Sequence, residues 1–239
     1  VDTNRPGMTE CEELLHVAKT IVVLDHHRQS SDNIDNALLS YIEPYASSAC
    51  EMVSEVLQYI VDDIKIPNLE ASSLYAGIMI DTNNFMNKTG VRTFEAAAFL
   101  RRSGADITLV RKMFRDDMES YRAKAQIISS AKVYHNKYAI ARGENLTIES
   151  PTIIGAQAAN ELLDINEVKA SFVLTTYNGR IYVSARSIDE VNVQIIMERL
   201  GGGGHMNASG AQFDHTDMDE AVADLKQVID DVIEGGEIE

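Results

Sequence analysis

Apolar residues recur at helical spacing through the first half of the chain. Thr9-Glu10-Cys11-Glu12 has the form of a capping box and predicts a helix over about 10–19, and the apolar run Ile21–Leu24 predicts a buried strand after it. A second capping box at Ser48–Glu51 predicts a helix with one apolar face. Further helices are expected over 69–80, 93–104, from 106 onward and over about 120–133. The end of the first of these, Gly77–Ile80, would also suit a strand.

Polar side chains follow the apolar strands. If Val1 ends an earlier strand, the order is strand, Asp2, helix, strand and Asp25-His26-His27, which is a βαβ unit. The carboxyl ends of parallel strands meet at one edge of the sheet, and ligands bind at that edge in open α/β folds. The sequence therefore predicts an α/β first domain, built on a parallel sheet, with acidic and imidazole side chains at a ligand-binding edge.

The apolar pattern changes to a period of two in the second half. Lys169–Tyr177 and Arg180–Arg186 flank Asn178-Gly179, which is a strong signal for a β-hairpin. Helices are expected around this hairpin over about 151–163, 190–200 and 217–234. We therefore predict a smaller α+β domain with a mixed or antiparallel sheet. The predicted domains are 1–117 and 134–239, joined by a helical linker over 118–133.

Charge and composition exclude several classes of protein. The 239 residues include 37 acidic and 21 basic ones, and the formal net charge of −16 repels long nucleic acids. The apolar run Leu74–Ile80 is far shorter than the roughly 20 residues that span a bilayer, so we expect no membrane contact from this chain. Cys11 and Cys50 lie in no metal-binding spacing, which favours a reducing, cytoplasmic setting.

Asp2, Asp25, His26-His27 and Asp81 are the candidates for chemistry in the first half. An Asp at the end of a strand often serves only to cap the next turn, so each carboxylate has that ordinary alternative. Adjacent histidines are harder to explain in this way, because a tight turn can direct one imidazole to a metal and its neighbour to a substrate. Carboxylates and imidazoles without a thiolate suit a hard or borderline divalent ion such as Mn²⁺.

The glycine run Gly201–Gly204 and His205 are the candidates in the second half. A flexible linker is the alternative, but each ordered Gly costs about 0.5–1 kcal/mol relative to Ala, so a fixed run should have a compensating contact. Exposed amides can approach a phosphate or a base, and His205 can stack or donate a hydrogen bond. We predict nucleotide binding by Gly202, Gly203, Gly204 and His205. Arg186 is the expected phosphate or base partner, with a solvated surface role as its alternative.

These motifs together resemble the DHH phosphoesterase family over nearly the whole chain. Asp25-His26-His27 lies between Asp2-Thr3-Asn4 and Gly77–Phe85, in the family's order. Gly201–His205 resembles the signature of the family's associated C-terminal domain. Two further segments are similar to one branch, the membrane-anchored bacterial cyclic-di-AMP phosphodiesterases, namely Glu43–Ser48 and Gly90–Ala97.

The resemblance implies a centre with two Mn²⁺ ions. Asp2 would bridge the ions, His26 and Asp81 would bind one of them, His27 would face the phosphate, and Asp25 would orient a histidine. The implied reaction is hydrolysis of cyclic-di-AMP to the linear dinucleotide pApA. The family's first motif, which supplies a His and two Asp ligands, is absent from the sequence. We therefore expect a truncated catalytic domain, an incomplete enzyme in this fragment, and anchoring of the longer protein at the cytoplasmic face of the membrane.

Two other functions stay open. One is an oligonucleotide-trimming phosphodiesterase of the same family, and the other is a nucleotide-sensing module that binds without hydrolysis. The residues alone do not distinguish adenine from guanine. They also leave the oligomeric state open, a homodimer included.

Overall fold

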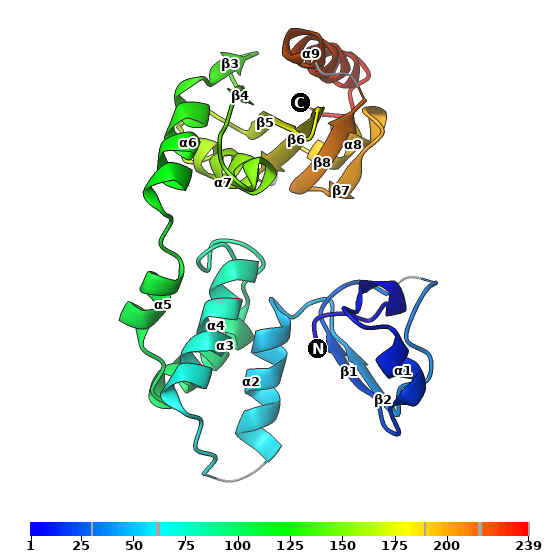
Figure 1. The fold of residues 1–239 in the computed structure, drawn as a ribbon, viewed down its shortest axis with the longest axis vertical. Coiled ribbons are helices and arrows are strands. Elements are labelled where there is room, and N and C mark those ends of the chain that lie inside the picture. The colour runs from blue at the N-terminus through cyan, green and yellow to red at the C-terminus, as the bar shows by residue number, and fades with distance from the viewer. Residues whose placement is uncertain (30, 61–62, 189, 215–216, 239) are drawn as a thin grey trace. The chain divides into compact units, whose positions relative to one another are not determined.

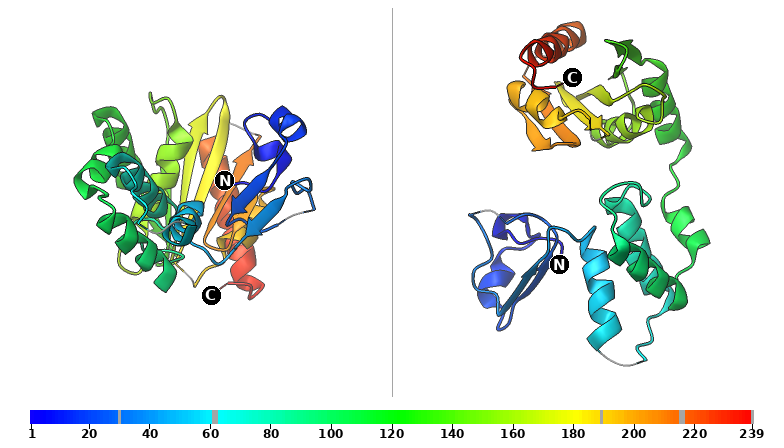
Figure 2. Two further views of the ribbon diagram at one scale, coloured as in Figure 1. Left: turned by 90° about the horizontal axis from the view of Figure 1, so that it is seen from below. Right: turned by 180° about the vertical axis from the view of Figure 1, so that it is seen from behind.

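The computed structural model of the chain describes residues 1–29, 31–60, 63–188, 190–214 and 217–238 (Figures 1 and 2). The chain divides into two compact units, Val1–Arg115 and Asp116–Glu239. Each unit has its own buried hydrophobic cluster or clusters. Among the described residues, no helix is both long enough and apolar enough to cross a membrane.

Unit 1 starts with four short elements: η1 (Pro6–Met8, a 3-10 helix), α1 (Glu13–Val17), β1 (Val22–Asp25) and β2 (Leu39–Ile42). β1 and β2 pair in parallel, so both the strand predicted at Ile21–Leu24 and the parallel arrangement are confirmed. Residues 1–5 are not in a strand. The Asp2 N–H nevertheless donates to the Leu24 C=O at 2.9 Å, which places Asp2 beside the end of β1.

The helix predicted over 10–19 is wrong in length. α1 has five residues, and its N-cap is Glu12 rather than Thr9. The Thr9 hydroxyl donates to the Pro6 C=O at 2.7 Å, so Thr9 closes η1 and does not cap a helix. The backbone is already extended at Ala18, and the chain then enters β1.

The rest of unit 1 is helical, with α2 (Ala49–Ile60), α3 (Asn68–Asp81), α4 (Val91–Arg102) and α5 (Ile107–Met113). α2, α3 and α4 contact one another, and Ile78 and Leu100 are fully buried in this layer. Gly77 allows α3 to approach α2 closely, because a Cβ at this position would lie 2.3 Å from the Cys50 sulfur. The predicted helices are confirmed here, and Gly77–Ile80 is helical rather than a strand.

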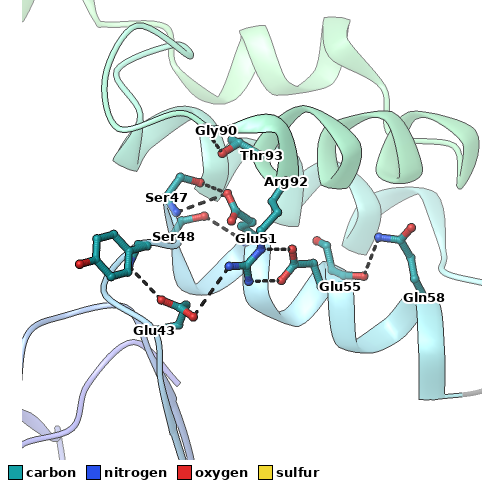
Figure 3. Close-up of polar contacts among 11 residues, drawn as sticks. Glu43, Ser47, Ser48, Glu51, Glu55, Gln58, Gly90, Arg92 and Thr93 are labelled. Atoms are coloured by element: carbon teal, nitrogen blue, oxygen red, sulfur yellow. Dashed lines mark hydrogen bonds and ion pairs between the residues drawn. The ribbon is translucent and has the colours of Figure 1, made fainter.

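Polar contacts hold the start of α2 and join α2 to α4 (Figure 3). The Ser48 hydroxyl accepts the Glu51 N–H at 3.0 Å, which is half of the predicted capping box. The Glu51 carboxylate does not complete the box, because it accepts hydrogen bonds from Ser47 instead. Arg92 of α4 forms a two-pronged ion pair with Glu55 of α2, with two N–O distances of 2.7 Å. These contacts fix α2 on the helical layer.

Unit 2 is built on a mixed sheet with the strand order β3-β4-β5-β6-β8-β7. β4 and β5 are parallel, and the other neighbouring strands are antiparallel. The α+β class and the mixed sheet predicted for the second domain are therefore confirmed. In chain order the elements are α6 (Met118–Ser129), β3 (Lys132–Tyr134), β4 (Tyr138–Gly143), α7 (Pro151–Leu162), β5 (Ala170–Tyr177), β6 (Arg180–Ser187), α8 (Val193–Arg199), β7 (Gly203–His205), β8 (Ala208–Phe213) and α9 (Met218–Glu234).

Alternate residues of the central strands face different helices. Tyr138 and Ile140 of β4 share a buried cluster with residues of α8 and α9. Ala139 and Ala141 of the same strand share another cluster with residues of α6 and α7. β4 and β5 are thus largely buried on both faces, whereas β6 alternates between buried and less buried residues, and this alternation is the two-residue period in the sequence.

The hairpin of β5 and β6 forms as predicted. Tyr177 lies opposite Arg180, and the two turn residues both have positive φ, 49° at Asn178 and 72° at Gly179. A type I′ turn requires this geometry at both positions, and Asn-Gly adopts it readily.

The structural division after Arg115 places α6 in unit 2, where Ala123 and Ile127 pack against α7. The domain boundaries predicted at 117 and 133, with a linker between them, stay a prediction.

Candidate functional site

Asp2, Asp25, His26 and His27 meet at the end of β1. Each offers one ligand atom, and these atoms all lie within 4.8 Å of one another. β1 ends at Asp25, so the two imidazoles extend from the turn that follows the strand. The structure therefore brings together these four residues, which the sequence had indicated as candidates for chemistry. Their individual roles stay predictions.

His26 is the centre of this cluster. Its Nε2 lies 3.3 Å from Asp2 Oδ1 and 4.0 Å from Asp81 Oδ2, and its side chain is only 11% exposed. Asp81 is the last residue of α3, so a loop, a strand end and a helix end each contribute one group. One imidazole nitrogen and two carboxylates form a donor set that fits a hard or borderline divalent cation such as Mn²⁺.

Asp2 has an unusual backbone conformation. Its φ is 64°, in the left-handed region that costs a non-glycine residue roughly 1–2 kcal/mol. The hydrogen bond from Asp2 N–H to the Leu24 C=O holds this conformation beside β1. Strain of this kind persists only where the surroundings determine it, and here it accompanies the approach of the Asp2 carboxylate to His26.

Asp25 is hydrogen-bonded to His27. The Asp25 side chain is fully buried, and its Oδ1 lies 2.7 Å from His27 Nδ1 and 3.2 Å from the His27 backbone nitrogen. Burial acts to raise the pKa of Asp25, but the hydrogen bonds from His27 and from Asn4 outweigh it and hold this pKa below its ordinary value. The His27 side chain is 54% exposed, so Nε2, the ring nitrogen that Asp25 leaves unengaged, belongs to a solvent-accessible imidazole.

Asn4 is a residue of this cluster to which the sequence interpretation assigned no role. Its Nδ2 donates to Asp25 Oδ2 at 2.6 Å, and the residue is 3% exposed. The available signal was its place in Asp2-Thr3-Asn4, two residues after a predicted ligand.

Two further groups near His26 have raised pKa values. Burial raises the pKa of Asp81, and the negative charge of Asp2 adds to this effect against the attraction of His26. Burial, together with the carboxylates of Asp81 and Asp2, raises the pKa of Cys50 to about 11.

The segment after Asp81 is a left-handed turn held by Thr82. Asn83, Asn84 and Phe85 have φ values of 46°, 59° and 65°. The fully buried Thr82 hydroxyl accepts the Phe85 N–H at 2.9 Å and donates to the Ile78 C=O at 2.6 Å. This turn ends α3 immediately after Asp81 and so fixes the position of that carboxylate.

The glycine run of unit 2 is ordered, because Gly203 and Gly204 form β7 with His205. A Cβ at Gly202 would lie 2.1 Å from the Gly210 oxygen, and one at Gly204 would lie 2.6 Å from Ser209 Cα. Close packing against β8 therefore accounts for Gly202 and Gly204, and no bound ligand is needed to explain them. Gly203 has no atom within 4 Å of the corresponding point, so its surface is open.

Arg186 and His205 share one face of the sheet. Arg186 on β6 and His205 on β7 each lie opposite Ala208 on the intervening strand β8. Directly opposite residues of antiparallel strands point to the same face, and two strand spacings separate the two residues by about 10 Å. The adjoining row on this face consists of Ser184, Gly210 and Gly203, which are small and partly exposed. These three small residues form a floor, as we call it below, between the Arg186 guanidinium and the His205 imidazole.

Arg186 is a cation that lacks a carboxylate partner among the described residues. Its guanidinium donates to the Ala185 C=O at 2.9 Å, and burial lowers its pKa from the ordinary value. A partly buried guanidinium without an anion is costly, and a bound phosphate would supply the missing charge.

Comparison with known proteins relates both units to one family. Residues 1–78 match the DHH family, N-terminal domain, and residues 143–234 match the DHHA1 domain. The cyclic-di-AMP phosphodiesterase GdpP of Geobacillus thermodenitrificans is 44% identical over 237 residues, which are 99% of this chain and 36% of that protein. The chain thus spans about a third of the length of this relative.

A shorter relative and a solved structure extend the comparison. The bifunctional oligoribonuclease and PAP phosphatase NrnA of Mycoplasma genitalium is 30% identical over 217 residues, covering 88% of this chain and 67% of that protein. The crystal structure of an exopolyphosphatase-related protein from Bacteroides fragilis shares the fold, with a TM-score of 0.82 and 24% identity, over 97% of this chain and 70% of the other.

Proposed function

The chain belongs to the DHH family, and on this premise we propose that it hydrolyses cyclic-di-AMP to linear pApA with the help of bound Mn²⁺. The observation that carries the proposal is the approach of Asp2 and Asp81 to one imidazole nitrogen of His26. The 44% identity to a cyclic-di-AMP phosphodiesterase supports the choice of substrate.

In this proposal Asp2, His26 and Asp81 would hold the metal, and Asp2 would be a ligand shared by two ions. Their oxygen and nitrogen donors suit Mn²⁺. Bound divalent ions supply Lewis acidity to a phosphodiester and lower the pKa of water. The protein fixes its ligands beforehand through the turn at Asp2 and the turn that ends α3.

His27 and Asp25 act on the phosphate rather than on the metal. Asp25 accepts from His27 Nδ1 and holds its ring in place, which leaves Nε2 free. The neutral ring could accept a proton from the attacking water at Nε2, and the protonated ring could then donate a hydrogen bond from Nε2 to a phosphate oxygen.

Unit 2 binds the nucleotide in this proposal. Arg186 neutralises a phosphate, and His205 stacks on or hydrogen-bonds a base across the floor of small residues. Gly202 and Gly204 permit β7 to lie close to β8, and the open surface of Gly203 admits the ligand. A net charge of −16 fits a short, discrete substrate better than a long polyanion.

Further ligands are expected from a longer protein. Three protein ligands are too few to hold two mutually repelling divalent ions, and the family's first motif would add a His and two Asp. We also propose that segments outside this chain anchor the longer protein at the cytoplasmic face of the cell membrane.

The test is product chromatography after incubation with cyclic-di-AMP and Mn²⁺. It uses this chain and a longer protein that includes the family's first motif, with chelated samples and His26→Ala as controls. Accumulation of pApA by the longer protein is the expected result. Absence of turnover by the longer protein, with metal and nucleotide both bound, would overturn the proposal and favour a sensing module.

Oligonucleotide trimming is the alternative that the relationship to NrnA favours. It predicts stepwise release of mononucleotides from short oligonucleotides at a rate above that of cyclic-di-AMP cleavage. Parallel assays on pApA, on a pentanucleotide and on cyclic-di-AMP separate the two activities.

A further inference from the structure

Asn4 joins three segments around the candidate centre. Its Nδ2 donates to Asp25 Oδ2 at 2.6 Å and to the His27 C=O at 3.4 Å, and its own C=O accepts the Ile34 N–H at 2.8 Å. Asn4 and Asp25 are 3% and 0% exposed. The contact between them is therefore shielded from water, where a hydrogen bond to a charged group is stronger than at the surface.

The two oxygens of Asp25 have separate partners. Oδ2 faces the Asn4 amide, and Oδ1 faces both the backbone N–H and the Nδ1 of His27. An ionised carboxylate can only accept hydrogen bonds. The contact between Asp25 Oδ1 and His27 Nδ1 is therefore donated by His27, and Nδ1 carries the proton. The neutral His27 ring must then have its lone pair on Nε2.

Asn4 makes this contact at a cost. Its Oδ1 is buried and has no hydrogen-bond partner among the described residues, which costs roughly 1–3 kcal/mol. A residue serving packing alone would not need to bury an unpaired amide oxygen. The hydrogen bond from Asn4 Nδ2 to Asp25 explains why a side-chain amide occupies this position.

We propose that Asn4 is a positioning residue that acts through Asp25 to fix His27 with its proton on Nδ1, so that Nε2 is free to take a proton at the reacting phosphate and, once protonated, to donate a hydrogen bond to a phosphate oxygen. The part concerning the phosphate rests on the proposed function. The part concerning the tautomer rests only on the contacts among Asn4, Asp25 and His27, and it can be tested without substrate.

The first test is nitrogen NMR of the imidazole rings in the 239-residue chain without added metal. The pH is raised until the nitrogen signals no longer change, because the tautomers are read from neutral rings. His27→Gln assigns the signals. We expect a proton on Nδ1 of His27, and a proton on Nε2 in the wild-type chain would overturn the proposal directly.

Variants of Asn4 then test its role in setting the His27 tautomer. Asn4→Ala and Asn4→Asp should each move His27 toward the Nε2-protonated form, since the Asp25 carboxylate, no longer held at Oδ2 by Asn4, can turn away from His27 Nδ1. Asn36→Ala is the matched control, because Asn36 Nδ2 donates to the Leu15 C=O in the same unit. His135 serves as an internal reference, since its Nε2 lies 2.7 Å from Asp230 Oδ1 in unit 2. A lower melting temperature with an unchanged His27 tautomer would make Asn4 merely structural.

Kinetics on the longer protein separate this inference from the proposed function. Asn4→Ala should lower kcat roughly 10- to 100-fold with little change in KM or in Mn²⁺ binding, as for other residues that orient an active-site group. A tautomer shift in a protein that does not cleave cyclic-di-AMP would refute the proposed function and leave the positioning role standing. Unchanged kcat together with a tautomer shift would refute the catalytic part of the inference.

Discussion

His26 Nε2 lies 3.3 Å from Asp2 Oδ1, although different backbone features place the two residues. Asp2 is held in the left-handed region by its hydrogen bond to Leu24, and His26 lies in the turn after β1. Both features involve the last residues of β1. A metal held by this pair would therefore be sensitive to any change that loosens the end of that strand.

Loss of either metal ligand should abolish activity. His26→Ala and Asp81→Ala are each expected to eliminate turnover by the longer protein and to reduce its Mn²⁺ content. Asp25→Asn should cost roughly 10- to 100-fold, because in the proposed function Asp25 orients a histidine and is not a metal ligand. The exposed His16 offers a control, since His16→Ala should change neither quantity. Wild-type turnover and manganese content in His26→Ala would show that the metal assignment is wrong.

Elements with a repeated local pattern could be predicted from the sequence. The Asn178-Gly179 hairpin and the helix α3 form as expected, because turn chemistry and apolar spacing act over a few residues. The helix over 10–19 failed because the Thr9 hydroxyl bonds to Pro6, a competing local contact that the capping pattern does not reveal.

Only part of the candidate site could be predicted from the sequence. Asp25-His26-His27 could be picked out because polar residues follow an apolar strand, and the structure brings Asp2 and Asp81 to them. The positive φ of Asp2 and the burial of Asn4 depend on tertiary contacts, so no local pattern could show them. Likewise, the packing roles of Gly202 and Gly204 depend on β8.

Gly203 and Gly204 should respond differently to substitution. Gly203→Ala is expected to keep the melting temperature and to weaken cyclic-di-AMP binding, because the new methyl group would lie on the open surface. Gly204→Ala should lower the melting temperature, since φ is 145° there and a Cβ would lie 2.6 Å from Ser209 Cα. Thermal melts and calorimetric titrations measure both effects. Unchanged binding in Gly203→Ala would argue against a ligand at this edge.

Arg186→Gln should weaken dinucleotide binding without destabilising unit 2. Hydrogen bonds to charged groups contribute about 1.5–3 kcal/mol, which corresponds to a loss of affinity of roughly 10- to 100-fold. No carboxylate partner among the described residues is lost with the guanidinium, so the melting temperature should not fall. Arg180→Gln on the same strand is the matched control, because Arg180 is exposed. Equal losses of affinity in both variants would indicate a general charge effect.

The contact of Asp230 with His135 and Tyr134 should make the stability of unit 2 depend on pH. Hydrogen bonds from His135 and Tyr134 lower the pKa of Asp230 in the folded chain. The stabilisation is therefore present above the ordinary aspartate pKa of about 3.9 and is lost as the pH falls through the lower, folded value.

Asp230→Asn should accordingly melt at a lower temperature than the wild-type chain at pH 7, and the difference should shrink in acid. Asp231→Asn is the control, because Asp231 accepts only a surface hydrogen bond from Gln227 at 2.8 Å among the described contacts of its side chain. Melting curves between roughly pH 3 and pH 7 test this. A difference that grows toward low pH would contradict the assigned direction.

The 239-residue chain should bind cyclic-di-AMP and not hydrolyse it. Arg186 and the segment from Gly201 to His205 lie in unit 2 and form a surface of their own, so binding does not require the metal centre. The proposed hydrolysis uses two ions, and Asp2, His26 and Asp81 alone would supply too few ligands to hold them against their mutual repulsion. A longer protein with the additional His and Asp ligands should recover Mn²⁺-dependent turnover. If the purified 239-residue chain cleaves cyclic-di-AMP as fast as the longer protein, both the expected missing motif and the two-ion proposal are refuted.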